Sequence, residues 1–246
     1  MANRIALVTG GMGGIGQAIC QELHQQQFRV IAAYSRQHAA AQAWQAEQRR
    51  LGFEFDIAYA DVTDFQSCEN MIKKMSNDIG PIDVLINNAG ITRDHACCHM
   101  SQAEWDSVIS TDLSSLFYVT RPLLEEMKQR NYGRIINISS INGQKGQFGQ
   151  VNYSAAKAGM HGFTKALARE VAKFHITVNT VSPGYVATEM VMSIPEDIKQ
   201  KILAEIPLGR FAQPEEVAHV VAFLADEKSA YITGANIAIN GGHYML

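Results

Sequence analysis

The stretch RIALVTGGMGGIGQAI, residues 4–19, passes from an apolar run directly into glycines and then into a helical pattern. We expect a strand, a glycine-rich turn and a helix in that order. Glycines allow a tight turn and a close approach of backbone to a pyrophosphate, and the helix N-terminus offers N–H groups and a positive dipole end. The stretch therefore predicts a dinucleotide site. The residues expected to line it are Gly10, Met12, Gly13, Gly14, Ile15 and Gly16.

The pattern of this first unit repeats, because short β-branched runs alternate with amphipathic helical stretches along the chain. The expected strands are 4–9, 28–33, 54–60, 82–87, 133–139, 176–182 and 235–240. The expected helices are 14–26, 38–51, 65–78, 101–130, 152–174 and 214–225. Strands that are apolar on both faces and alternate with helices predict an α/β fold. Right-handed crossovers then give a Rossmann-type, doubly wound parallel sheet of about seven strands, with helices on both faces.

One domain over residues 1–246 is expected, because the chain has no linker, internal repeat or low-complexity tract. Residues 185–213, between the sixth and seventh expected strands, interrupt the alternation. An insertion beyond the carboxyl end of a strand usually lies over a ligand. We therefore expect residues 185–213 to form a helical flap that covers the substrate, and we call this segment the flap.

Composition and charge exclude several classes of protein. The chain is 47% hydrophobic and 18% charged, as globular proteins are, and its net charge of −3 gives no reason to expect nucleic acid or an anionic membrane as partner. It has neither an apolar run of roughly 20 residues nor the layout of a signal peptide, so we expect a soluble cytoplasmic protein. His95 and His99 could share a helical face, but no third ligand accompanies them, so no metal site is expected.

The end of the second expected strand distinguishes between the two nicotinamide cofactors. An NAD site would place Asp or Glu there to hold the ribose 2′-hydroxyl, whereas this chain has Tyr34, Ser35 and Arg36. Arg36 could pair with a 2′-phosphate and Ser35 could donate to it, although a solvated surface arginine is the alternative. The sequence thus predicts NADP(H). Asp61 and Val62 fall where an adenine ring would lie, unless Asp61 is a helix cap.

Tyr153 and Lys157 stand four residues apart in NYSAAKAGMHGFTKALA, residues 152–168, which has a helical pattern. Side chains at i and i+4 share a helical face, so the phenol and the ammonium can point into one cleft. A free tyrosine titrates near roughly pH 10 and is too weak an acid for reversible proton transfer near neutrality. A fixed ammonium stabilises the phenolate, which suits the pair to proton donation to a ketone. Taken alone, such a pair more often only packs and solvates.

With the glycine loop, NNAGI at 87–91 and the Tyr153/Lys157 pair in register, the chain resembles the short-chain dehydrogenase/reductase family over essentially its whole length. The resemblance implies hydride transfer from a nicotinamide to a carbonyl carbon, with Tyr153 as proton donor. It implies that Ser140, rather than its neighbour Ser139, holds the carbonyl oxygen. Lys157 would also bind the nicotinamide ribose hydroxyls.

The resemblance implies further cofactor contacts in two segments, the motif after the fourth strand and the turn that binds the carboxamide. These residues are Asn88, Ala89, Gly90, Pro183, Gly184, Val186 and Thr188. One family residue is missing, because STDLSSLF offers Asp112 where the family carries an asparagine in its proton relay. Asp112 is therefore a candidate catalytic residue, and its charge near Lys157 could shift pKa values there.

Within the family, the chain looks most like the reductases that act on acetoacetyl-CoA in polyhydroxybutyrate synthesis. The similarity lies in INGQKGQFGQVNYSAAKAG, NNAGITRD and VSPGYVATEM, and it implies an acyl-CoA substrate. Five residues are expected to contact that substrate: Asp94, Gln147, Phe148, Gln150 and Tyr185. Two amides, a phenyl and a phenol suit a short, polar β-keto thioester better than a long acyl chain.

The similar 3-oxoacyl-(acyl-carrier-protein) reductases are the alternative. The chain has basic residues that could face an acidic carrier protein, namely Arg93, Arg121, Lys128 and Arg130. A nucleotide-binding regulator without catalysis is a further alternative that Asp112 suggests, but the intact Ser140, Tyr153 and Lys157 oppose it. The apolar tail ANIAINGGHYML resembles tails that pack between subunits in the family, which implies a homotetramer.

Overall fold

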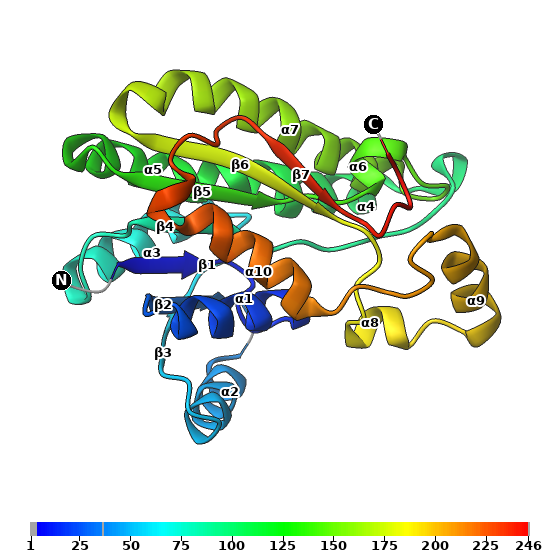
Figure 1. Ribbon diagram of the computed structural model, residues 1–246, viewed down its shortest axis with the longest axis horizontal. Coiled ribbons are helices and arrows are strands. Elements are labelled where there is room, and N and C mark those ends of the chain that lie inside the picture. The colour runs from blue at the N-terminus through cyan, green and yellow to red at the C-terminus, as the bar shows by residue number, and fades with distance from the viewer. Residues whose placement is uncertain (1–3, 36, 246) are drawn as a thin grey trace.

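The computed structural model describes residues 4–35 and 37–245, apart from the side chain of Met190. Its centre is one sheet, in which the strands of this part of the chain run parallel in the order β3-β2-β1-β4-β5-β6-β7 (Figure 1). The strands are β1 Ile5–Val8, β2 Arg29–Tyr34, β3 Phe55–Tyr59, β4 Val84–Asn87, β5 Gly133–Ile138, β6 Ile176–Pro183 and β7 Asn236–Ile239. The predicted doubly wound Rossmann-type sheet is confirmed.

Helices cover both faces of the sheet (Figure 1). One face packs against α1 (Gly14–Gln25), α2 (His38–Arg50) and α10 (Pro214–Ala225). The other face packs against α3 (Phe65–Asp78), α5 (Ser115–Arg130) and α7 (Val151–Val171). Among the residues that the structure describes, no helix is both long and apolar enough to cross a membrane.

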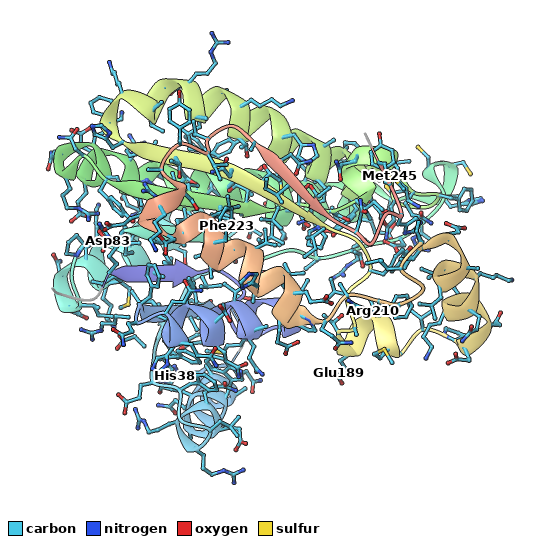
Figure 2. The ribbon with its side chains drawn as sticks, viewed as in Figure 1. His38, Asp83, Glu189, Arg210, Phe223 and Met245 are labelled. Carbon is cyan, nitrogen blue, oxygen red and sulfur yellow. The ribbon has the colours of Figure 1, made fainter. Side chains whose placement is uncertain are left out.

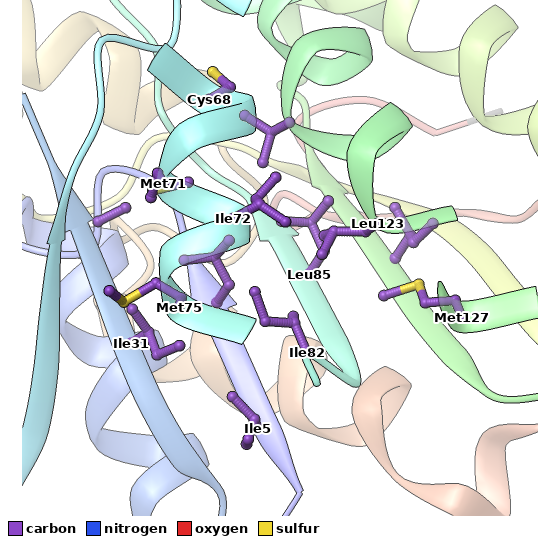
Figure 3. Packing of buried hydrophobic residues seen from close by; sticks show 14 of the residues in the cluster. Ile5, Ile31, Cys68, Met71, Ile72, Met75, Ile82, Leu85, Leu123 and Met127 are labelled. Atoms are coloured by element: carbon purple, nitrogen blue, oxygen red, sulfur yellow. The ribbon is translucent and has the colours of Figure 1, made fainter. Parts of the chain in front are cut away.

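The two apolar cores explain why the strands read as apolar on both faces. Alternate strand residues point to opposite sides, so Leu7 and Leu85 join the core beneath α3, α5 and α7, while Val8 and Ile86 join the core beneath α1 and α10. Figure 3 shows the first of these cores, with side chains of α3, β4 and α5 packed together. Both layers hold the carboxyl ends of the strands in fixed positions.

The expected single helix at 101–130 is instead divided. It consists of α4 (Gln102–Val108), a π-helical segment at Ile109–Ser114 and α5. A π-helical turn inserts an extra residue and commonly occurs at functional sites. Here tertiary contacts hold the widened turn, because the buried carboxylate of Asp112 accepts a hydrogen bond from the Ile91 N–H at 2.9 Å.

The flap contains α8 (Glu189–Met192) and α9 (Glu196–Glu205) and lies beyond the carboxyl ends of the strands (Figure 1). Its two stems are joined by a parallel bridge between Val186 and Ala212. The Ala212 N–H also donates to the Tyr185 carbonyl at 3.0 Å. Figure 2 labels Glu189 and Arg210 on the flap and Asp83 at the opposite end of the molecule. The flap is thus a loop closed at its base.

Candidate active site

The glycine loop suits a dinucleotide because neighbouring backbone lies where the side chains of other residues would stand, so the loop and the helix after it can pack closely. A Cβ on Gly16 would lie 2.2 Å from the Gly10 carbonyl oxygen, so the helix passes the loop at a distance that only glycine allows. Gly10 adopts a φ of 61°. α1 begins at Gly14 with no acidic residue in its first turn, which leaves its N-terminus suited to an anion. The contact of this cradle with a pyrophosphate stays a prediction.

Asn88 and Ala89 lie directly against this loop. The Asn88 side chain donates to the carbonyls of Thr9 at 3.0 Å and Gly10 at 3.1 Å. The Thr9 hydroxyl accepts from the backbone N–H groups of Asn88 and Ala89, at 2.9 and 3.1 Å. Thr9 was not among the predicted site residues, and only its place at the end of the first strand could have pointed to it. These bonds join β1 to β4 where the cofactor is expected.

The turn from Pro183 to Thr188 reaches the same loop from the flap side. The Gly184 N–H donates to the Ile239 carbonyl at 2.9 Å, which ties the turn to β7. The methyl group of Thr188 lies 3.0 Å from the position that a Cβ on Gly14 would occupy. Val186 is buried and forms the bridge at the base of the flap. The predicted carboxamide turn and the predicted phosphate loop are therefore neighbours.

The predicted adenosine contacts lie at the ends of β2 and β3. Ser35 is exposed there, and Arg36 lies outside the described residues. The Asp61 carboxylate accepts from the N–H and the hydroxyl of Thr63, at 2.9 and 2.6 Å. The N-cap of α3 is Asp64, so Asp61 shapes the turn before the helix and is not its cap. Val62 is buried beside it.

The two serines after β5 have different partners. The Ser139 hydroxyl donates to the Lys157 carbonyl at 2.9 Å, so its proton holds α7 against the strand. The Ser140 hydroxyl accepts from the Asn142 N–H at 3.1 Å, and its own proton has no acceptor among the residues that the structure describes. Ser140 is therefore the serine whose hydroxyl can donate to a substrate oxygen.

The ammonium of Lys157 is close to three groups, namely the Ile138 carbonyl, the Asp112 carboxylate and the Tyr153 ring. Its Nζ donates to the Ile138 carbonyl at 3.0 Å, lies 3.2 Å from Asp112 Oδ2, and lies 5.3 Å from the centre of the Tyr153 ring. Lys157 and Asp112 are 3% and 0% exposed, whereas Tyr153 is half-buried. A Cβ on Gly90 would lie 2.7 Å from Asp112 Oδ2, so Gly90 lies against the ion pair. The candidate residues Asp112, Tyr153 and Lys157 thus form one cluster.

Burial and charge act on this ion pair in opposite directions. Burial lowers the pKa of Lys157, but the charges of Asp112 and Tyr153 and the hydrogen bond to Asp112 outweigh it, so the pKa of Lys157 is raised. Burial raises the pKa of Asp112 more strongly than Lys157 and the Ile91 N–H lower it. Lys157 therefore stands as an ammonium beneath the phenol.

Two of the predicted substrate residues, Gln150 and Asp94, are bonded to each other. Gln150 donates to the Asp94 carboxylate at 2.7 Å and accepts from the Asn142 amide at 2.9 Å. Gln147 is exposed, and the Phe148 side chain is 90% exposed. The chain of bonds through Gln150 joins the loop after β4 to the short helix α6 (Asn142–Lys145).

Two asparagines at this edge were missed by the sequence reasoning. Asn142 bonds to both Ser140 and Gln150. The buried Asn152 donates to the carbonyls of Arg93 at 2.9 Å and Glu104 at 3.3 Å. It thereby fixes the start of α7, from which Tyr153 projects. Only the places of Asn142 and Asn152 close to Ser140 and Tyr153 in the chain could have pointed to them.

Comparison with known proteins agrees with this geometry. The model of the short chain dehydrogenase family matches residues 4–199. The chain belongs to that family. It is 53% identical to the acetoacetyl-CoA reductase of Cupriavidus necator over 100% of both chains. It is 51% identical to that of Allochromatium vinosum, over 98% of this chain and 99% of the relative. It is 43% identical to the 3-oxoacyl-[acyl-carrier-protein] reductase of Escherichia coli, over 99% of this chain and 98% of the relative.

Membership makes the chain an NAD(P)-dependent oxidoreductase, and the resemblance seen in its sequence is confirmed. The cradle around the glycine loop fits that cofactor. Within residues 4–35 and 37–245, no three His, Cys, Asp or Glu side chains are grouped so that they could hold a metal ion.

Proposed function

We propose that the chain catalyses the NADPH-dependent reduction of acetoacetyl-CoA to (R)-3-hydroxybutanoyl-CoA. The observation that carries the proposal is the buried ammonium of Lys157, which lies next to the Tyr153 ring and against Gly90, with Ser140 directly after the serine that bonds to the Lys157 carbonyl. Full-length identity of about half to curated acetoacetyl-CoA reductases supports the choice of substrate.

NADPH, when bound, supplies the hydride that the carbonyl carbon receives. Tyr153 donates its phenolic proton to the oxygen that becomes the hydroxyl group. Ser140 donates a hydrogen bond to that oxygen and orients it. Lys157 stabilises the phenolate left on Tyr153, and Asp112 holds the ammonium in place.

We assign NADP(H) rather than NAD(H) to the site. The support is the absence of a carboxylate from the segment Tyr34-Ser35-Arg36 that follows β2, together with Arg36 as a partner for the 2′-phosphate. Arg36→Asp should reduce the ratio of NADPH to NADH affinity, measured by fluorescence titration. A ratio equal to that of the parent chain would contradict the assignment.

The substrate side supports a short acyl thioester. Gln150 and Asp94 are polar groups linked to Ser140 through Asn142, Gln147 and Phe148 are exposed in the loop after α6, and Tyr185 lies at the base of the flap. Of the four basic residues that could face a carrier protein, Arg130 is already paired with Asp83 and the Ile82 carbonyl, so its charge is less available to an acidic partner.

The test follows NADPH absorbance with purified chain and either acetoacetyl-CoA or acetoacetyl-acyl-carrier protein. We expect higher kcat/KM with the CoA thioester. A clear preference for the carrier-protein thioester would establish the alternative reductase activity. No oxidation with either substrate would contradict the proposal and favour a non-catalytic NADP-binding regulator.

We also propose that the chain assembles as a cytoplasmic homotetramer. The support is the half-exposed apolar edge strand β7, with the exposed side chains of Phe223 and Tyr231 near it in the chain. Light scattering after gel filtration should give the mass of four chains. A monomer at micromolar concentration would contradict this assembly.

A further inference from the structure

Two charged side chains, Lys145 and Glu205, meet at His243, outside the catalytic cluster. His243 Nε2 lies 2.8 Å from Lys145 Nζ and 3.1 Å from Glu205 Oε2. The imidazole ring stacks on Tyr185, with ring centres 5.9 Å apart and planes at 21°. The side chain of His243 is only 4% exposed. We call Lys145, Glu205 and His243 the tail latch.

The latch joins three segments of the chain, namely α6, the flap and the tail. Lys145 ends α6, which follows Ser140, and Glu205 ends α9 in the flap. His243 lies in the tail after β7, which turns back beside α6 in Figure 1. The tail also holds the flap by backbone, because the Leu208 N–H donates to the Gly241 carbonyl at 3.1 Å. Movement of the flap away from α6 would break the contacts at His243.

The chemistry of the latch explains why a histidine suits this position. Lysine only donates hydrogen bonds and a carboxylate only accepts them, whereas an imidazole nitrogen accepts or donates according to its proton. His243 Nε2 can therefore bond to Lys145 or to Glu205, and the nearby opposite charges favour either arrangement. His243 Nδ1 is buried and has no hydrogen-bond partner among the described residues, so the ring is held by stacking on Tyr185.

Tyr185 is the predicted substrate residue that touches the latch. It lies on the first stem of the flap, its carbonyl accepts from the Ala212 N–H at 3.0 Å, and its ring also contacts Phe211. Burial raises the pKa of Tyr185, and the charges of Glu205 and Asp94 raise it further. Asp94 is itself bonded to Gln150.

We propose that His243 is a positioning residue that, with Lys145 and Glu205, fixes Tyr185 and the flap over the acyl thioester. This inference rests on the proposed function. A loosened latch leaves Ser140, Tyr153 and Lys157 in place and costs binding of the substrate instead. The expected signature is a raised KM for acetoacetyl-CoA at nearly constant kcat.

The kinetic test compares His243→Leu, which removes both hydrogen-bonding roles, with His243→Gln, which keeps a donor and an acceptor. We expect His243→Leu to raise KM about three- to tenfold, the size of one lost hydrogen bond, with kcat within about twofold. His243→Gln should recover part of that loss. Unchanged KM in His243→Leu, or an equal fall of kcat in both variants, would overturn the proposal.

Glu205→Gln tests the flap side of the latch and is exposed enough to spare the fold. Combined with His243→Leu, Glu205→Gln should raise KM little further, because both substitutions weaken the same contact between His243 and Glu205. Glu196→Gln is the matched control, since it removes the same charge from α9, where Glu196 pairs with Lys199 and Gln200. An equal rise of KM in the control would assign the effect to helix charge and overturn the latch.

Limited trypsin digestion separates this proposal from the proposed function, because it needs no turnover. Cleavage after Lys201 in α9 should be several-fold faster in His243→Leu than in the parent chain without substrate. Equal cleavage rates would overturn the latch even if acetoacetyl-CoA is reduced. Faster cleavage in a chain that reduces neither thioester would leave the latch supported and the proposed function wrong.

Discussion

The sheet has a carboxyl edge, where its parallel strands end, and an amino edge, where they begin. Both edges carry buried charge, but the charged groups have different neighbours. At the carboxyl edge, the Asp112–Lys157 pair lies next to the Tyr153 ring and against Gly90. At the amino edge, Asp83 accepts from the Ile5 N–H at 2.9 Å and pairs with Arg130. The charges of the amino edge are bonded to the ends of strands, whereas the ammonium of the carboxyl edge faces a phenol.

Buried charge alone therefore does not identify an active site. At the amino edge, the Tyr132 ring is sandwiched between Arg4 and Arg134, at 3.4 and 4.6 Å from the guanidinium carbons. Arg134 is 3% exposed and donates to the carbonyls of Gly133 and His175. These cations contact an aromatic ring and backbone carbonyls at the amino edge of the sheet. At the other edge the neighbouring phenol of Tyr153 is half-buried, which gives the buried ammonium of Lys157 a reacting group to act on.

Lys157→Met should have the largest effect, because it removes the ammonium and leaves Asp112 buried without its partner. We expect kcat to fall about 10²–10⁴-fold and the free energy of unfolding to fall by about 3–5 kcal/mol. Urea unfolding and NADPH oxidation measure the two losses. Adding Asp112→Leu should restore part of the stability and none of the activity. A double variant that regains activity would contradict a catalytic role for the pair.

Asp83→Asn tests the amino edge. It weakens charge-assisted hydrogen bonds to Arg130 and the Ile5 N–H, so the free energy of unfolding should fall by about 1.5–3 kcal/mol. We expect kcat/KM to stay within about twofold of the parent chain. A fall in kcat/KM at a temperature where the variant is fully folded would show that the two edges are not separate in function.

Asp112→Asn should move the pH profile while the protein stays active. The Asp112 charge raises the pKa of Lys157, so the amide allows that pKa to fall. Activity needs the ammonium and is lost as pH rises through the pKa of Lys157. The alkaline limb of kcat should therefore shift to lower pH in the variant. If neither the rate nor the profile changed, the identity of this side chain would not matter.

Glu216→Gln should have the smallest effect, since it alters an exposed pair at the end of the flap. Arg210 binds both oxygens of Glu216 at 2.7 Å, and with the Gln213 N–H it lowers the pKa of Glu216 from 4.5 to about 2. A pKa that is lower in the folded chain adds stability at every pH above the pKa of the unfolded chain. That stability is lost as the pH falls from 4.5 towards about 2. The variant should flatten this acid limb of thermal stability. An unchanged slope would show that the pair is solvated.

The sequence predicted the sheet well because its signals are local. Each β-branched run became a strand to within one or two residues, and only the long helix at 101–130 was wrong in form. The helical periodicity of the sequence continues through Ile109–Ser114, so no local pattern predicts the π-helical segment. Its cause is tertiary, since Asp112 bonds to Ile91 and pairs with Lys157.

The site was predictable where motifs lie on neighbouring strand ends. Parallel strands bring Gly10, Asn88 and Ser140 to one edge, so chain order gave their proximity. The tail latch lay beyond such reasoning, because Lys145, Glu205 and His243 meet through the path of the flap and the tail. Neither path follows from strand periodicity. The role of each site residue stays a prediction.

The most direct test of the central claim is NADPH oxidation with acetoacetyl-CoA by Tyr153→Phe, with Tyr231→Phe as control. Tyr231 is fully exposed, and the same hydroxyl is removed there without touching the Lys157 cluster. We predict that Tyr153→Phe still binds NADPH and unfolds at the parent temperature but loses about 10²–10⁴ in kcat, while the control keeps parental activity. A Tyr153→Phe protein that reduces acetoacetyl-CoA at the parental rate would contradict the account.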